Sequence, residues 1–70
     1  MDLFYVRICR RINMFALSEY KEYFTSESGM KRYIDFFEKN LYSEDSMWIM
    51  DTGKAYVNNN DMIVAEEDML

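Results

Sequence analysis

An amphipathic stripe near the middle of the chain is the feature that most limits what these 70 residues can fold into. In the segment SESGMKRYIDFFEKNLY, apolar side chains recur three and four positions apart, at Met30, Tyr33, Ile34, Phe37 and Leu41. Ser26 or Ser28 can cap the start of a helix, and Glu27 suits the positive end of its dipole. Lys39 and Asn40 suit the other end. The pattern predicts one helix whose apolar face needs a second layer to cover it.

The segments before this helix have the composition of β-strands. Residues 3–12, LFYVRICRRI, are rich in β-branched and aromatic side chains, and their apolar face holds Phe4, Val6, Ile8 and Ile12, with Arg10 as its one breach. A helix fits the same residues at a spacing of four, but the β-branched content favours a strand. Residues 17–24 fit a strand and a helix almost equally, and we assign a strand that pairs back on the first.

Short apolar segments alternate with turn-forming residues after the helix. Residues 47–51 and 55–57 are predicted strands on either side of a turn at Thr52-Gly53-Lys54, where glycine permits positive φ. Residues 58–61, NNND, form a second predicted turn, and residues 62–65 are a candidate last strand. The predicted fold is α+β: a small antiparallel sheet in the order β-β-α-β-β, with a candidate fifth strand, and one amphipathic helix packed on one face. Residues 1–70 make a single small domain, in which residues 66–70 are predicted to be a frayed acidic tail.

The sequence lacks the side chains on which most catalytic and metal sites depend. With no histidine and one cysteine, it excludes Ser-His-Asp and Cys-His catalysis, an intrachain disulfide and a Cys/His zinc site. The run DTGKAYVNNNDM lacks the oxygen ligands and the closing glutamate of an EF-hand. We therefore expect no enzyme activity, no metal and no cofactor.

Hydropathy and amino-acid composition bear on location and origin. No apolar run reaches the roughly 18 residues of a membrane span, and the start MDLFYV does not resemble a signal peptide, so we expect a cytoplasmic protein without membrane contact. Residues with A/T-rich codons far outnumber those with G/C-rich codons, which fits phages and low-GC bacteria.

Three arginines lie close together in VRICRRI, residues 6–12. In a strand, Arg7 and Arg11 share one face with Tyr5, while Arg10 points to the other. Two arginines beside a tyrosine suit single-stranded nucleic acid, and a nucleic-acid-binding accessory protein is our alternative hypothesis. The net charge of −5 favours instead internal ion pairs with Glu19, Glu22 or the acidic tail, so we expect no nucleic-acid partner.

Acidic charge and surplus aromatic side chains favour a protein partner. Aromatic residues make up 17% of the chain, more than a core of this size needs. Our leading hypothesis is a small acidic protein-binding module, encoded by a phage, that inhibits or modulates a host protein such as a CRISPR or restriction enzyme. Its carboxylates would occupy a basic surface in place of phosphates. A structural homodimer is a third hypothesis. The candidate contact residues are Asp35, Phe36, Glu38, Glu44, Asp45, Trp48, Asp51, Tyr56, Asp61, Glu66, Glu67 and Asp68.

Overall fold

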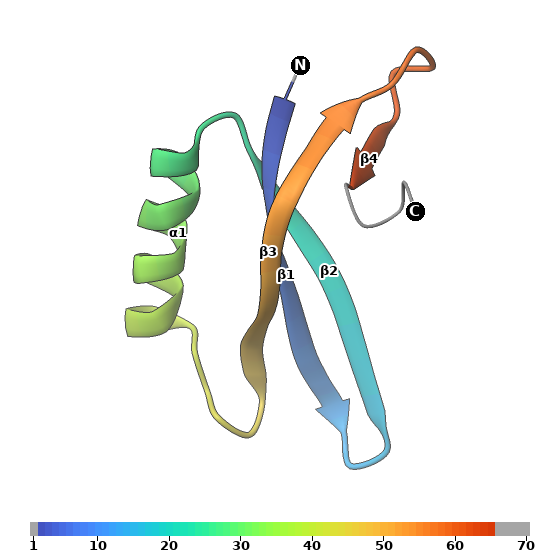
Figure 1. The fold of residues 1–70 in the computed structure, drawn as a ribbon. Helices are drawn as coiled ribbons and strands as arrows, with labels where there is room; N and C mark the ends of the chain where they lie inside the picture. Colours follow the sequence, from blue (N-terminus) through green and yellow to red (C-terminus); the bar gives the residue numbers. More distant parts are fainter. Residues whose placement is uncertain (1, 66–70) are drawn as a thin grey trace.

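One antiparallel sheet and one helix make up the computed structural model, which describes residues 2–65 (Figure 1). The strands pair in the order β2-β1-β3-β4, so that β1 lies inside the sheet. The predicted α+β class and the order β-β-α-β-β are confirmed. No helix in residues 2–65 combines the length and apolar character needed to cross a membrane. The elements are β1 (Asp2–Asn13), β2 (Ala16–Phe24), α1 (Glu27–Asn40), β3 (Met47–Val57) and β4 (Ile63–Ala65).

The helix α1 covers one face of the sheet through the predicted apolar stripe. Val6 and Ile8 of β1 are fully buried against Met30 and Phe37 of α1. Half-buried apolar side chains surround these four: Phe4, Phe24, Tyr33, Ile34, Met47 and Ile49. Burial of a Phe or Ile side chain contributes about 1.5–3 kcal/mol, so this cluster is the main stabilising term of the fold.

The ends of the predicted stripes lie outside this cluster. Ile12 is 63% exposed and Leu41 is 39% exposed, which corrects their assignment to the core. Both residues lie beyond the region where the short helix and the longer hairpin overlap. Arg10, on the same face as Ile8, is exposed for the same reason, so its charge does not breach the packed part of the sheet.

Local interactions explain where α1 begins and ends. The Ser26 hydroxyl accepts a hydrogen bond from the Gly29 N–H at 3.1 Å, as an N-cap does. Two ion pairs spaced i,i+4 support the exposed face, Glu27–Lys31 at 3.3 Å and Asp35–Lys39 at 3.0 Å. Each is exposed and contributes about 0.3–0.5 kcal/mol.

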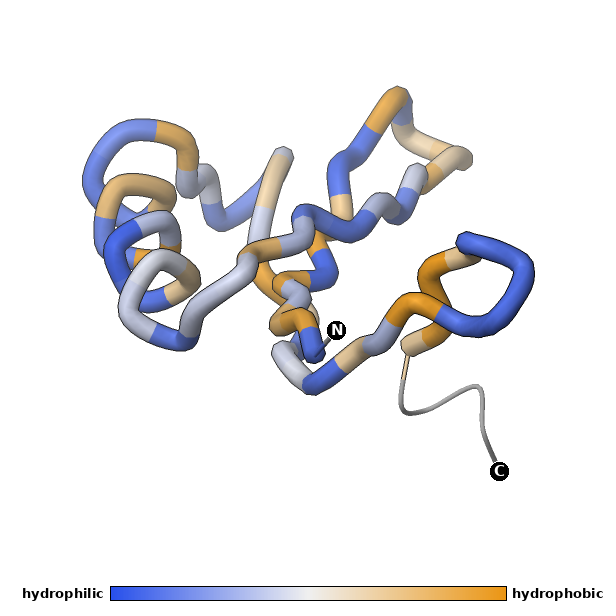
Figure 2. Tube along the Cα trace, turned by 90° about the horizontal axis from the view of Figure 1, so that it is seen from above, coloured by the Kyte–Doolittle hydropathy of each residue, from blue (hydrophilic) through white to orange (hydrophobic). Residues whose placement is uncertain are grey.

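A second, smaller core lies on the face of the sheet opposite α1. Leu3 and Tyr5 of β1 are buried there against Ala55 of β3 and Ala65 of β4, with Val57 packed at the side. Figure 2, seen from above, shows α1 on one side of β1 and the β3–β4 hairpin on the other. No sequence pattern predicts this cluster, because its alanines carry little hydropathy signal.

Strand β3 runs unbroken through the segment where the sequence predicts a turn. Gly53 pairs with Tyr5 and has no positive φ, and the chain continues to Val57, which corrects the predicted turn at Thr52-Gly53-Lys54. A Cβ at Gly53 would lie 2.6 Å from the Tyr5 ring. Glycine therefore serves close packing here. The one irregularity is a bulge at Met50, where the pairing shifts from Arg7–Asp51 to Ile8–Ile49. The second predicted turn is confirmed, and Asp61 there has a φ of 59°.

Gly53→Ala is expected to destabilise the protein, although alanine normally favours a strand over glycine. The added methyl group would displace the Tyr5 ring. Overpacking of this kind costs about 1–3 kcal/mol in the free energy of unfolding. In a Tyr5→Leu background the same change should cost much less, and urea denaturation of the four proteins measures this coupling. A stabilising Gly53→Ala would show that the ring does not limit this position.

Tyr33 supplies a test of the packing between α1 and β2. Its ring lies 5.1 Å from that of Phe24, and burial raises the pKa of its hydroxyl, with Tyr20 and Glu22 adding to the shift. A raised folded-state pKa stabilises the fold below about pH 10, the unfolded value, and this contribution is lost as pH rises through the folded pKa. Tyr33→Phe should therefore make the loss of stability above pH 10 shallower in urea titrations. An identical pH profile would contradict the assignment.

Candidate protein-interaction groove

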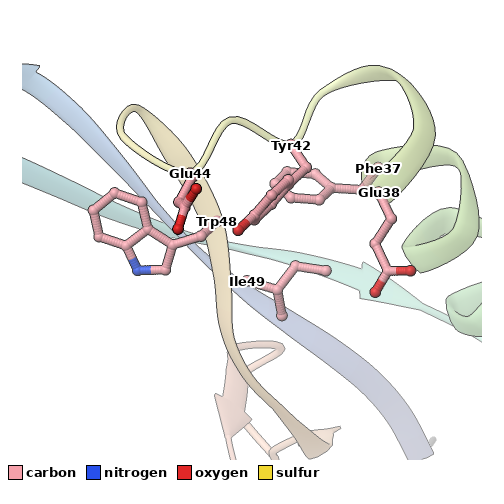
Figure 3. Close-up of a pocket in the computed structure, with 6 residues that line it drawn as sticks. All are labelled: Phe37, Glu38, Tyr42, Glu44, Trp48 and Ile49. Carbon is pink, nitrogen blue, oxygen red and sulfur yellow. The ribbon is translucent and has the colours of Figure 1, made fainter.

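An open groove of about 730 Å³ lies where the C-terminal end of α1, residues 41–46 and the start of β3 meet (Figure 3). The groove forms because α1 packs on β1 and β2, which leaves the first part of β3 beside the helix without a helical cover. Its lining consists of Phe37, Glu38, Tyr42, Glu44, Trp48 and Ile49.

Apolar and aromatic side chains form most of the lining. Phe37 is fully buried at the base, and Ile49 and Trp48 of β3 are half-buried. In Figure 3 Tyr42 and Phe37 lie on the helix side of the groove, and Ile49 points into the space between the helix and the strand. Tyr42 is 52% exposed, so much of its ring is available to a partner. Such surfaces of amphipathic aromatic residues are typical of protein interfaces.

Backbone hydrogen bonds hold the loop that forms one wall of the groove. The Phe37 carbonyl accepts bonds from the N–H groups of both Leu41 and Tyr42, each at 2.8 Å. Ser43 and Met47 exchange two bonds of 2.9 Å. Tyr42 and Glu44 are therefore placed by a fixed backbone, which lowers the entropy cost of binding.

Arg11 contacts Trp48 on the face of the sheet opposite α1, and it also bonds the loop that forms one wall of the groove. Its guanidinium lies 6.0 Å from the centre of the Trp48 ring, and its Nε donates to the Asp45 carbonyl at 2.9 Å. The Arg11 N–H donates to the Ser46 carbonyl at 2.7 Å. This arginine therefore positions the tryptophan that lines the groove.

The rim of the groove is negatively charged. Glu38 on α1 and Glu44 in the loop are both exposed, and neither forms an ion pair within the described residues. In Figure 3 the Glu44 carboxylate lies beside Trp48, and that of Glu38 extends from the helix toward Ile49. An apolar floor with two carboxylates at its edge suits a segment that carries both apolar and cationic side chains.

Only part of the predicted contact set gathers here. Glu38, Glu44 and Trp48 line the groove, and Asp45 lies in the loop beside it. Phe36, 51% exposed on α1, does not line the groove.

The other predicted contact residues lie elsewhere. Asp35 pairs with Lys39, Asp51 pairs with Arg7, and Tyr56 is half-buried beside Val64 of β4. Asp61 lies in the turn before β4. Glu66, Glu67 and Asp68, with the predicted frayed tail, lie outside the described residues.

The arginine face of β1 makes contacts within the chain. Arg7 forms a bidentate ion pair with Asp51, with Nε–Oδ1 at 3.0 Å and Nη2–Oδ2 at 2.9 Å. Asp51 is not among the partners predicted for this arginine from the sequence. Tyr5 is only 4% exposed, and Lys21 lies 5.2 Å from its ring centre. A buried tyrosine cannot stack on a nucleobase, so this geometry does not favour the alternative hypothesis of nucleic-acid binding.

The tip of the β1–β2 hairpin is an exposed apolar feature that the sequence analysis missed. Phe15 is 94% exposed there, and Met14 is 83% exposed. Ile12 and Leu17 flank them and are also exposed. The turn sequence NMFA could have indicated this feature, because it contains bulky apolar residues where polar residues are usual.

A comparison of the chain with protein-family models, curated proteins and solved structures finds no match.

Proposed function

We propose that this chain is an acidic protein-binding module whose groove takes up a basic, partly apolar segment of a partner protein. The observation that carries the proposal is the combination of Tyr42 and Trp48 with two exposed carboxylates, Glu38 and Glu44, around one groove. The aromatic side chains supply desolvated anchors, and the carboxylates select lysine or arginine at the edge.

The edge of β3 next to the groove offers a way to bind an extended segment. Met47 uses its outward N–H and C=O to pair with Ser43. Since outward-pointing groups alternate along an antiparallel strand, those of Ile49 point the same way. Strand β4 pairs with β3 only at Ala55–Val57. A partner segment that adds to this edge would place alternate side chains into the groove, as in β-strand addition.

The net charge supports one class of partner. Proteins that handle nucleic acids carry basic, extended surfaces, and a compact module of net charge −5 can occupy such a surface in place of phosphates. We propose that binding of this kind inhibits or modulates a nucleic-acid-handling enzyme of the host, such as a CRISPR or restriction enzyme.

Neutralising the rim should weaken binding to a basic peptide. Trp48 is the chain's single tryptophan and lines the groove, so its fluorescence reports occupancy. We expect a peptide of alternating lysine and valine to change this emission and to lose affinity as salt rises. Exposed ion pairs contribute about 0.2–1 kcal/mol each, so Glu38→Gln/Glu44→Gln should weaken binding roughly two- to thirtyfold.

The matched control is Asp35→Asn/Asp61→Asn, which removes the same charge away from the groove and keeps a residue that tolerates positive φ at position 61. It should bind the peptide nearly as well as the unaltered protein. Equal loss of affinity in both double variants would show that net charge alone attracts the peptide. No fluorescence change at low salt would reject the groove.

The proposed inhibition has a separate test with host enzymes. The purified protein should reduce DNA binding by a basic nucleic-acid enzyme of its host, and Trp48→Ala should relieve that inhibition at least tenfold, the usual loss for a buried interface aromatic residue. A shift of DNA or RNA caused by this chain alone would support the nucleic-acid-binding alternative and contradict the proposal.

A further inference from the structure

The outer edge of β2 is a long, regular strand edge with no partner strand in residues 2–65. Strand β2 (Ala16–Phe24) ends the sheet on one side, and β4 ends it on the other (Figure 1). Its pairing with β1 is regular from Leu17 to Phe24, with the only shift at the turn end of the hairpin. The segment ALSEYKEYF contains no proline, although it carries three charged side chains, Glu19, Lys21 and Glu22, which oppose the pairing of edges unless a partner strand complements them.

We propose that two copies of this chain pair through β2, antiparallel, about a two-fold axis that passes beside Tyr20. The two four-stranded sheets would then form one continuous sheet of eight strands. This interface lies on β2 and is separate from the groove at α1 and β3.

The order of charges along β2 selects this register. With Tyr20 opposite itself, Glu19 of each copy faces Lys21 of the other, so two opposite-charge pairs form. Leu17, which is 55% exposed, faces Tyr23 on the same side of the sheet. Ser18 faces Glu22, so no charge opposes a like charge in any of the nine positions.

Neighbouring registers lack this complementarity. A two-fold pairing that keeps each face of the sheet continuous must centre on a residue, because side chains alternate with a period of two. Centring on Glu19, Lys21 or Glu22 places that residue opposite its own copy, which sets like charges against each other. Centring on Ser18 pairs only the first five residues of the strand. The Tyr20-centred register alone uses the whole strand.

The contacts of β2 within one chain are compatible with this pairing. Lys21 lies 5.2 Å from the Tyr5 ring centre, on the face of the sheet opposite α1. In the dimer, the side chain that pairs with Lys21 across the two strands would lie on that same face. Tyr20 and Tyr23 are each 37% exposed, so pairing covers apolar surface that one chain leaves in water.

Cysteine cross-linking tests the register directly. Tyr20→Cys would put two thiols opposite each other with Cα atoms about 4.5–5.5 Å apart, within disulfide range. Ser18→Cys, the matched control, would put them four positions apart, about 13 Å, which is too far. Under mild oxidation, Tyr20→Cys should form a covalent dimer and Ser18→Cys should not. The unaltered protein should not either, since Cys9 is buried. Cross-linking of Ser18→Cys in preference to Tyr20→Cys would overturn the register.

A charge swap tests the Glu19–Lys21 pairs in solution. Lys21→Glu sets two glutamates against each other twice and should weaken the dimer at least tenfold in sedimentation. Glu19→Lys/Lys21→Glu restores opposite charges and should recover most of that loss, although it also removes the contact with Tyr5. Circular dichroism verifies that each variant is folded.

Sedimentation of the unaltered protein as a monomer up to millimolar concentration would reject the dimer itself. Equal weakening by the single and the swapped variant would reject the Glu19–Lys21 pairs and with them the proposed register. Glu38→Gln/Glu44→Gln should dimerise normally. Failure of the dimer would therefore leave the groove proposal intact, and failure of the groove would leave the dimer intact.

Discussion

Burial of β1 on both of its faces is the constraint on which the rest of this structure depends. A chain of 70 residues buries only about 60% of its surface, and this one has no disulfide to compensate. It therefore buries both faces of its central strand. Val6 and Ile8 pack under α1, and Leu3 and Tyr5 pack under β4. The outer parts of the sheet then remain at the surface, because one short helix and a three-residue strand cannot cover them.

The sequence patterns predicted the elements better than their contacts. Alternation in β1 and the apolar stripe in α1 were sufficient to predict the strand and the helix, because each pattern reports a whole buried face. The turn predicted at Gly53 was wrong, because a single sequence does not distinguish a glycine that permits a turn from one that makes room for a ring. The core under β4 depends on Ala55 and Ala65, and small residues of this kind carry no pattern.

Several residues of the groove could be predicted from the sequence, but their arrangement could not. Glu38, Glu44 and Trp48 were each candidates, but nothing in the sequence indicated that these three gather while Asp51 and Asp61 lie apart. Their meeting depends on how the loop after α1 is bonded, through the Phe37 carbonyl and the Ser43–Met47 pair. The partner of Arg7 was also missed, because it depends on the register of β1 with β3.

The lone cysteine gains a meaning from its position on the central strand. Cys9 is 2% exposed and pairs with Glu19 on one side and Trp48 on the other. A thiol reagent can reach this sulfur only when the structure around Cys9 opens. The rate of chemical labelling of this sulfur would therefore measure how often the structure around the central strand opens.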